Sequence, residues 1–190
     1  MKLSPFLQSI CFELRYCSML RFFVLLVLAT ACTKTPEPSI PPVIPPLSII
    51  NTEADLFRIS TYDTTFYWYQ NSARRRMSAN ASAHSPWMRV RYNALAATVL
   101  SDSGRLPVNG VFPRGSLIVK ELFESDTSTL AYLAVMYKDT LHPQQAFGWV
   151  WGEFESSGTA LITLNSRGNL CTSCHQTDSR DMTRLFDLHP

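Results

Sequence analysis

Four runs of β-branched and aromatic residues dominate the second half of the chain. They occupy residues 116–123, 130–137, 147–154 and 159–163, and turn-type stretches separate them at hairpin distances. Side chains of these kinds fit the pleated surface of a sheet, and short polar connections are typical of β-hairpins. Because no helical pattern interrupts the series, the sequence predicts an antiparallel meander.

Helical spacing precedes the meander in two places. Residues 52–72 have apolar positions compatible with a helix broken near residues 61–65, although the β-branched residues there weaken that interpretation. Ser85-Pro86 supplies a capping residue and a proline at the first helical position, and apolar residues follow at spacings of three and four. This pattern predicts a helix over residues 87–101 that packs on the sheet. The expected fold class is α+β, a mainly antiparallel sheet with flanking helices.

The first 31 residues are typical of an export signal. Arg15 and Arg21 precede an apolar run at residues 22–28, which is too short to span a bilayer permanently. The following Ala29-Thr30-Ala31-Cys32 is similar to a bacterial lipobox, in which Cys32 becomes the lipidated first residue. Ala29 stands where such boxes usually have leucine, so an ordinary cleavable signal or an anchor is the alternative.

A proline-rich stretch follows the signal. Residues 32–47 form an expected extended tether, and the folded domain is expected over residues 48–190. Together these features predict a lipoprotein of the bacterial cell envelope, periplasmic or associated with the outer membrane and held to the membrane through Cys32.

The charge of the expected mature chain is balanced. Removing Lys2, Arg15, Arg21 and Glu13 from 17 basic and 15 acidic residues leaves 14 of each. A neutral chain gives no reason to expect nucleic-acid binding.

Cys171-Thr172-Ser173-Cys174-His175 carries the most specific chemistry in the sequence. Two cysteines two residues apart, followed at once by histidine, are typical of covalent haem c attachment, in which the thiols form thioethers and the imidazole binds iron. A zinc site, a disulfide or thioredoxin-like pair, and a chance match are the alternatives. Zinc lacks a second ligand pair, and no strand of a βαβ unit leads into the motif. A short turn or helix is expected at the motif, and a closing helical segment at residues 181–188.

The order of several motifs resembles the cytochrome P-460 family, which includes the cytochromes c′-beta. The resemblance covers residues 87–187, and FPRGSLIVKEL at residues 112–122 is its most specific part. The remaining matches are VMYK at 135–138, GWVWG at 148–152, CTSCH at 171–175, and Asp181-Met182 with Phe186.

The resemblance implies a small antiparallel β domain, often dimeric, with one covalent haem c and an open sixth iron position. By position, Cys171 and Cys174 would form the thioethers and His175 would be the proximal ligand. Lys120 matches the lysine that is bonded to a porphyrin meso carbon in hydroxylamine-oxidising members. These members also place a carboxylate shortly after the haem histidine, which Asp178 matches only with an offset of about one position; a surface aspartate in a polar turn is the alternative.

The residues themselves give Lys120 two interpretations. Strand alternation puts Lys120 on the face of Ile118 and Leu122, where an ammonium must be paired, neutralised or used covalently. Either Lys120 forms the cross-link, or it extends to the sheet edge or pairs with a haem propionate. No spacing marks a sixth iron ligand among His84, His142, His189, Met136 and Met182.

Three functions follow from these features. The first is an enzyme that oxidises hydroxylamine or nitric oxide and passes electrons to another cytochrome. The second is a protein that binds such gases without turnover, and the third is a simple electron carrier with a sixth protein ligand. The sequence favours the first two, because no sixth ligand stands out.

Overall fold

The computed structural model describes residues 47–62, 66–77, 84, 87–101, 104–176 and 180–184. All of these residues belong to one unit, Pro42–Pro190. The predicted signal, most of the tether and the capping dipeptide Ser85-Pro86 lie outside the described residues.

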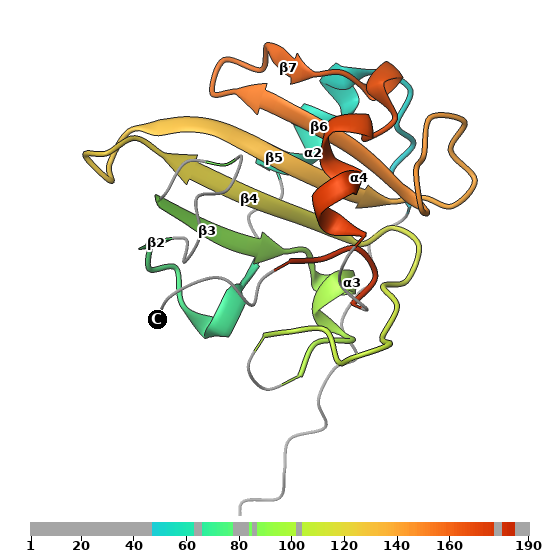
Figure 1. Ribbon diagram of the computed structural model, residues 1–190, viewed down its shortest axis with the longest axis horizontal. Coiled ribbons are helices and arrows are strands. Elements are labelled where there is room, and N and C mark those ends of the chain that lie inside the picture. The colour runs from blue at the N-terminus through green and yellow to red at the C-terminus, as the bar shows by residue number, and fades with distance from the viewer. Residues whose placement is uncertain are drawn as a thin grey trace, which may run out of the picture. The chain divides into compact units, whose positions relative to one another are not determined.

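One antiparallel sheet organises the described chain (Figure 1). In their order across the sheet the strands are β1 (Tyr67–Trp68), β3 (Trp87–Tyr92), β4 (Leu117–Phe123), β5 (Leu130–Lys138), β6 (Trp149–Glu155) and β7 (Ala160–Ile162), and β2 (Arg76–Met77) also pairs with β3. The four predicted strands correspond to β4, β5, β6 and β7, and each pairs with its neighbour in the chain. The antiparallel meander and the α+β fold class are confirmed.

The helix predicted over residues 87–101 is wrong, because its first part is strand β3. Met88, Val90 and Tyr92 point to one face of the sheet and are buried. On the opposite face Arg89 and Arg91 bracket Glu121 of β4, and the Nε of Arg91 donates to Glu121 Oε1 at 2.7 Å. A helix would separate both arginines from this carboxylate.

Only a short helix remains of that prediction. It is α3 (Ala94–Ala97), and Asn93 caps it by accepting a hydrogen bond from the Ala96 N–H at 2.9 Å. The same Asn93 oxygen accepts the N–H of Leu117, the first residue of β4, at 3.0 Å. Asn93 therefore fixes the start of the helix and the start of the strand together.

The helical pattern of residues 52–72 is half confirmed. Its first part forms α2 (Glu53–Tyr62), whereas the part after the expected break contains β1 and the 3₁₀ turn η1 (Tyr69–Asn71). The aromatic Phe57 of α2 contacts Phe154 of β6, with ring centroids 5.6 Å apart. This contact belongs to the protein core.

Two hydrophobic clusters cover the two faces of the sheet. One cluster gathers around α2 and includes Leu56, Val119, Leu133, Val135 and Phe154. The other includes Val90, Ile118, Leu122, Trp149 and Trp151, and the half-buried Cys171 packs against it. Helix α4 (Asn169–His175) lies against this second face, opposite α2 (Figure 1).

The segment after α4 does not begin the predicted closing helix. Asp181 and Met182 have φ values of 51° and 68°, which are left-handed, and residues 180–184 form a turn followed by irregular chain. Residues 185–188 lie outside the described residues. Among the described helices, none has the length and apolar character needed to cross a membrane.

Candidate functional site

Helix α4 carries the whole CTSCH motif, as the sequence predicted. Gly168 begins it with φ of 62°, and a Cβ built there would lie 2.5 Å from Trp151 Cδ1, so only glycine lets the helix start this close to the indole. Cys171, Cys174 and His175 follow at helical spacings of three and four, which brings their side chains to one side of the helix. Neither cysteine is in a disulfide, and burial raises the pKa of the Cys171 thiol to about 11.

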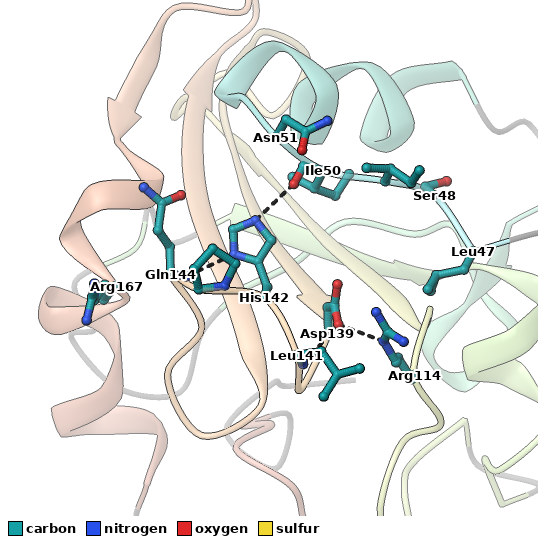
Figure 2. A pocket seen from close by; sticks show the side chains of 12 residues that line it. Leu47, Ser48, Ile50, Asn51, Arg114, Asp139, Leu141, His142, Gln144 and Arg167 are labelled. Carbon is teal, nitrogen blue, oxygen red and sulfur yellow. Dashed lines mark hydrogen bonds and ion pairs between the residues drawn. The ribbon is translucent and has the colours of Figure 1, made fainter.

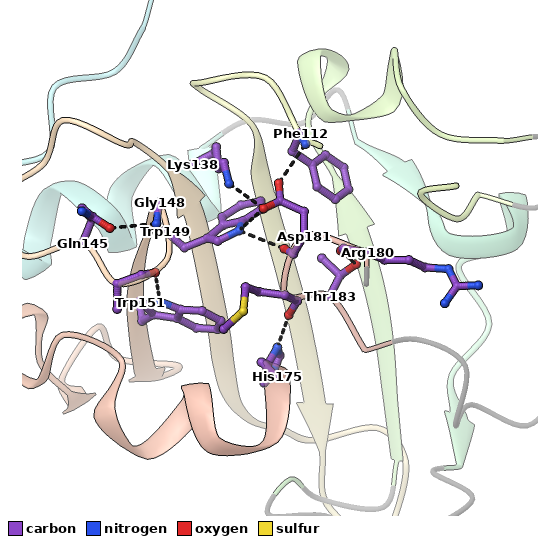
Figure 3. Close-up of polar contacts among 12 residues, drawn as sticks. Phe112, Lys138, Gln145, Gly148, Trp149, Trp151, His175, Arg180, Asp181 and Thr183 are labelled. Carbon is purple, nitrogen blue, oxygen red and sulfur yellow. Dashed lines mark hydrogen bonds and ion pairs between the residues drawn. The ribbon is translucent and has the colours of Figure 1, made fainter. Parts of the chain in front are cut away.

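The imidazole of His175 is held from two directions. Its Nδ1 donates to the carbonyl oxygen of Met182 at 2.6 Å (Figure 3). The imidazole also makes an edge-to-face contact with the Trp151 indole, in which the ring centroids are 5.1 Å apart and the ring planes meet at 80°. Because a carbonyl only accepts, the neutral ring carries its proton on Nδ1 and presents Nε2 as the basic nitrogen.

Asp181 anchors the turn that supplies this carbonyl. Its Oδ1 lies 2.6 Å from Lys138 Nζ, and its Oδ2 accepts the Phe112 N–H at 2.8 Å. Its backbone carbonyl accepts the Trp149 indole N–H at 3.0 Å (Figure 3). The turn is thereby tied to β5, to β6 and to the loop that precedes β4.

Lys120 lies on the sheet face that α4 covers. The strand register places it beside Ala134 of β5, and Ala134 beside Glu153 of β6. Lys120 is half-buried and shares its face with Ile118 and Leu122, which confirms the predicted orientation. The small Ala134 side chain leaves room between the lysine and the carboxylate.

Glu153 and His84 form the polar part of this face. His84 Nδ1 lies 3.7 Å from Glu153 Oε1. Burial raises the pKa of Glu153, and Lys120 opposes that shift. Burial lowers the pKa of His84 to about 3, with further contributions from Lys120 and His175. His84 is therefore neutral at physiological pH, and its contact with Glu153 is not an ion pair there.

The other predicted site residues divide into two groups. Asp178, Cys32, Phe186 and His189 lie outside the described residues. His142 lies away from α4, and both of its ring nitrogens have partners: Nε2 donates to the Ile50 carbonyl at 2.9 Å, and Nδ1 accepts the Gln144 N–H at 3.1 Å. These bonds remove His142 as an iron ligand.

Sequence reasoning missed three members of the site. Lys138 and Asp181 were part of the family resemblance without a role, and Glu153 was not singled out. Lys138 and Glu153 share a face with Lys120 through the register of β4, β5 and β6, a signal that strand alternation contained. The left-handed turn at Asp181 had no comparable signal.

A hollow in the surface of the domain lies away from these residues. It has a volume of about 530 Å³ and is lined by Leu47, Ile50, Arg114, Asp139, His142 and Arg167, among others (Figure 2). Arg114 Nε donates to Asp139 Oδ1 at 2.7 Å, and His142 bonds to the chain as described above. Several polar groups that line the hollow are thus hydrogen-bonded to one another or to the backbone.

The residues around α4 fit a haem c by their chemistry. Two cysteines outside any disulfide have the spacing of haem c attachment, and the adjacent imidazole already donates Nδ1–H to a backbone carbonyl, as metal-binding histidines usually do. In the described part of the chain, no group of three or more His, Cys, Asp or Glu side chains could hold a metal ion by itself.

Comparison with known proteins agrees with this chemistry. The family model for cytochrome P460 matches residues 67–184, which is more than half of the chain and spans β1 through the turn after α4. No curated protein matches the chain. The matched segment contains Lys120, Lys138, Glu153, CTSCH and Asp181 in one continuous alignment. The chain therefore belongs to the cytochrome P460 family, whose members are haem-containing cytochromes.

Proposed function

We propose that this chain is an exported cytochrome with one covalent haem c, which binds or oxidises small nitrogen compounds such as hydroxylamine or nitric oxide. The observation that carries the proposal is the hydrogen bond from His175 Nδ1 to the Met182 carbonyl, within a CTSCH helix of a cytochrome P460 family member. The bond orients a neutral imidazole with Nε2 as its donor atom, which is the state that iron ligation requires.

Three residues of α4 have distinct roles in this proposal. Cys171 and Cys174 would hold the porphyrin through thioethers, and His175 Nε2 would bind the iron. A bound haem supplies one-electron chemistry and an iron that coordinates nitrogen oxides. Trp151 limits rotation of the His175 ring through their edge contact.

Proton handling belongs to the polar part of the same sheet face. Oxidation of hydroxylamine releases protons together with electrons, so turnover needs a nearby base. Glu153 is a half-buried carboxylate on this face, and burial raises its pKa toward the range in which it can exchange protons. Neutral His84, 3.7 Å from Glu153 Oε1, is placed to pass a proton outward. Glu153 is therefore a candidate acid-base group in addition to Asp178, which lies outside the described residues.

Lys120 decides between two forms of the site. Its amine either bonds covalently to the porphyrin or acts as the charge partner of Glu153 and of a haem propionate. The register across Ala134 and the opposing effect of Lys120 on the pKa of Glu153 are compatible with both forms.

The decisive experiment is spectroscopy of the protein matured in a host that attaches haem c. We expect a denaturing mass that includes one haem and a reduced spectrum of a covalent haem. Cys171→Ala and Cys174→Ala should impair retention of the haem, and His175→Ala should change the spectrum while attachment persists. A colourless matured protein, or an unchanged His175→Ala spectrum, would overturn the assignment.

The cross-link has its own spectral test. A strongly red-shifted Soret band that reverts to an ordinary haem c band in Lys120→Ala supports covalent use of the lysine. An unshifted band assigns Lys120 to charge pairing, and ready uptake of nitric oxide then favours binding without turnover. Glu153→Gln separates these functions further, because it should lower hydroxylamine oxidation and leave nitric oxide uptake intact.

An electron carrier is the second candidate, and His84 is the residue that supports it. His175 contributes to the lowered pKa of His84, so the two imidazoles are close enough to interact. If His84 were a sixth ligand, His84→Ala would convert a six-coordinate spectrum into a five-coordinate one and would open the iron to carbon monoxide. Equal carbon monoxide uptake by both proteins would exclude this role.

A further inference from the structure

The turn that faces His175 adopts an unfavourable backbone conformation. Asp181 and Met182 have consecutive φ values of 51° and 68°, and neither residue is glycine. A side chain in the left-handed region costs about 1–2 kcal/mol per residue, so the surrounding structure must hold this turn in place.

The buried ion pair of Lys138 and Asp181 provides that hold. The two side chains are only 5% and 9% exposed, and their charged atoms lie 2.6 Å apart. The second carboxylate oxygen is bonded by the Phe112 N–H, and the lysine ammonium lies 4.8 Å from the centre of the Trp149 ring. Figure 3 shows these groups converging on Asp181 from separate segments.

The ion pair connects to His175 through one peptide unit. The carbonyl of Met182, the residue after Asp181, accepts Nδ1–H of His175 at 2.6 Å. A displacement of Asp181 would therefore displace this acceptor. A stronger bond at Nδ1 increases the electron density of the imidazole and makes Nε2 a better donor to iron.

We infer that Asp181 and Lys138 are positioning residues that set the donor strength of His175, and with it the reduction potential of the haem. The inference rests on the proposed function, because it requires His175 to be the axial ligand. Neither residue touches the iron; both act through the Met182 carbonyl.

Asp181→Asn tests this inference in the matured protein, because it removes the charge and keeps the side-chain shape. A weaker bond at Nδ1 should raise the reduction potential and lower the iron–histidine stretching frequency in the reduced state. Lys138→Met should shift both quantities in the same direction. The double variant should shift them no further than either single one, since all three changes break one connection.

Asp139→Asn is the matched control. Asp139 pairs with Arg114 at 2.7 Å, has a side chain that is 10% exposed, and follows Lys138 in the chain, but it has no bond to the turn at Asp181. Its substitution should lower the free energy of unfolding and leave the reduction potential and the iron–histidine stretching frequency unchanged. If Asp181→Asn behaved like this control, Asp181 would be a structural residue and the inference would be wrong.

Two further measurements keep the outcome interpretable. Should Asp181→Asn leave Lys138 buried without its partner and fail to fold, the double variant with Lys138→Met removes both charges and takes its place.

In the haem-free protein, nitrogen NMR of His175 reports the proton on Nδ1 directly, and the double variant should show a mixture of tautomers. This readout tests the connection even if the wild-type protein carries no covalent haem, which would instead overturn the proposed function. An unchanged tautomer would overturn the inference.

Discussion

Gly168 meets two requirements that another residue cannot satisfy together. Its φ is 62°, and an added Cβ would lie 2.5–2.8 Å from three atoms of the Trp151 indole. Gly168→Ala should therefore reduce the free energy of unfolding by about 1–3 kcal/mol and shift the haem spectrum, because Trp151 also contacts His175. Urea unfolding and the absorption spectrum of the matured protein measure the two effects.

Gly158 provides the comparison for Gly168. It also has a positive φ, of 93°, and its added Cβ would meet the Phe57 ring on the opposite side of the sheet. Gly158→Ala should lower stability to a similar extent with no change in the spectrum. A spectral shift in Gly158→Ala would mean that backbone strain anywhere in the domain disturbs the haem.

His84 predicts a specific dependence of stability on pH. Its pKa falls from 6.5 to about 3 on folding, mainly through burial, and Lys120, Glu153 and His175 face it. Below pH 6.5 the unfolded chain binds a proton that the folded chain rejects, so stability should fall as the pH falls from 6.5 toward 3. The slope from this one group is at most about 1.4 kcal/mol per pH unit.

His84→Gln should flatten that dependence. The variant and the parent protein should approach each other in free energy of unfolding as the pH falls, when urea titrations are recorded at several pH values between 6.5 and 4. Parallel curves for the two proteins would mean that His84 titrates normally in the folded state.

Strand β3 depends on a carboxylate between two guanidinium groups. Arg89 and Arg91 both pair with Glu121, and Arg91 also donates to the Ser60 carbonyl at 2.7 Å. Glu121→Ala leaves two buried or half-buried cations facing each other, so we expect a loss of about 3 kcal/mol. Glu155→Ala, at an exposed position of β6, should change stability by about 0.5 kcal/mol or less. Thermal unfolding of both variants checks the contrast.

The outcome for β3 shows what the chain pattern can and cannot specify. Residues 87–99 place apolar side chains at spacings that satisfy a helix, while residues 87–92 also alternate as a strand requires. The partner of Arg89 and Arg91 is Glu121, about thirty residues further along, and local spacing contains no information about that pairing. For β4 to β7 the turns and β-branched runs agree, so local pattern was sufficient.

The candidate site divides in the same way. Cys171, Cys174 and His175 are adjacent in sequence, and their spacing alone indicated their chemistry. Asp181 reaches Lys138 across 43 residues, and Glu153 meets Lys120 only through the register of three strands. Such contacts depend on tertiary structure, which the sequence alone did not specify.

Core residues on the two faces of the sheet should differ in their effect on the haem: both faces contribute to stability, but only the face covered by α4 contacts the haem-attachment motif. Leu56 of α2 is fully buried on the sheet face opposite α4. Leu56→Ala should cost about 2–5 kcal/mol of unfolding free energy and leave the absorption spectrum unchanged. Leu106→Ala, in the cluster against which Cys171 packs, should lower stability and also alter the spectrum. Identical spectral behaviour of the two variants would contradict this separation.

The expected membrane anchor is a property of the full chain. If Cys32 is the lipidated residue, Cys32→Ser should abolish incorporation of a labelled fatty acid and release the protein from membranes. Cys174→Ser should retain the label, because that cysteine is assigned to the haem. Continued labelling of Cys32→Ser would show that another residue carries the lipid and would count against the lipobox interpretation.

The tie between Met182 and His175 has a consequence for biogenesis. If the chain is exported and receives a covalent haem, as proposed, it emerges with its amino end first, so Cys171 and Cys174 reach the attachment machinery before the Met182 carbonyl that restrains His175. The thioethers could therefore form while this segment is still unfolded. The Asp181–Lys138 ion pair and the Met182–His175 hydrogen bond would form afterwards. Covalent attachment of the haem and restraint of the His175 imidazole would then be successive steps, which pulse-chase labelling could separate in time.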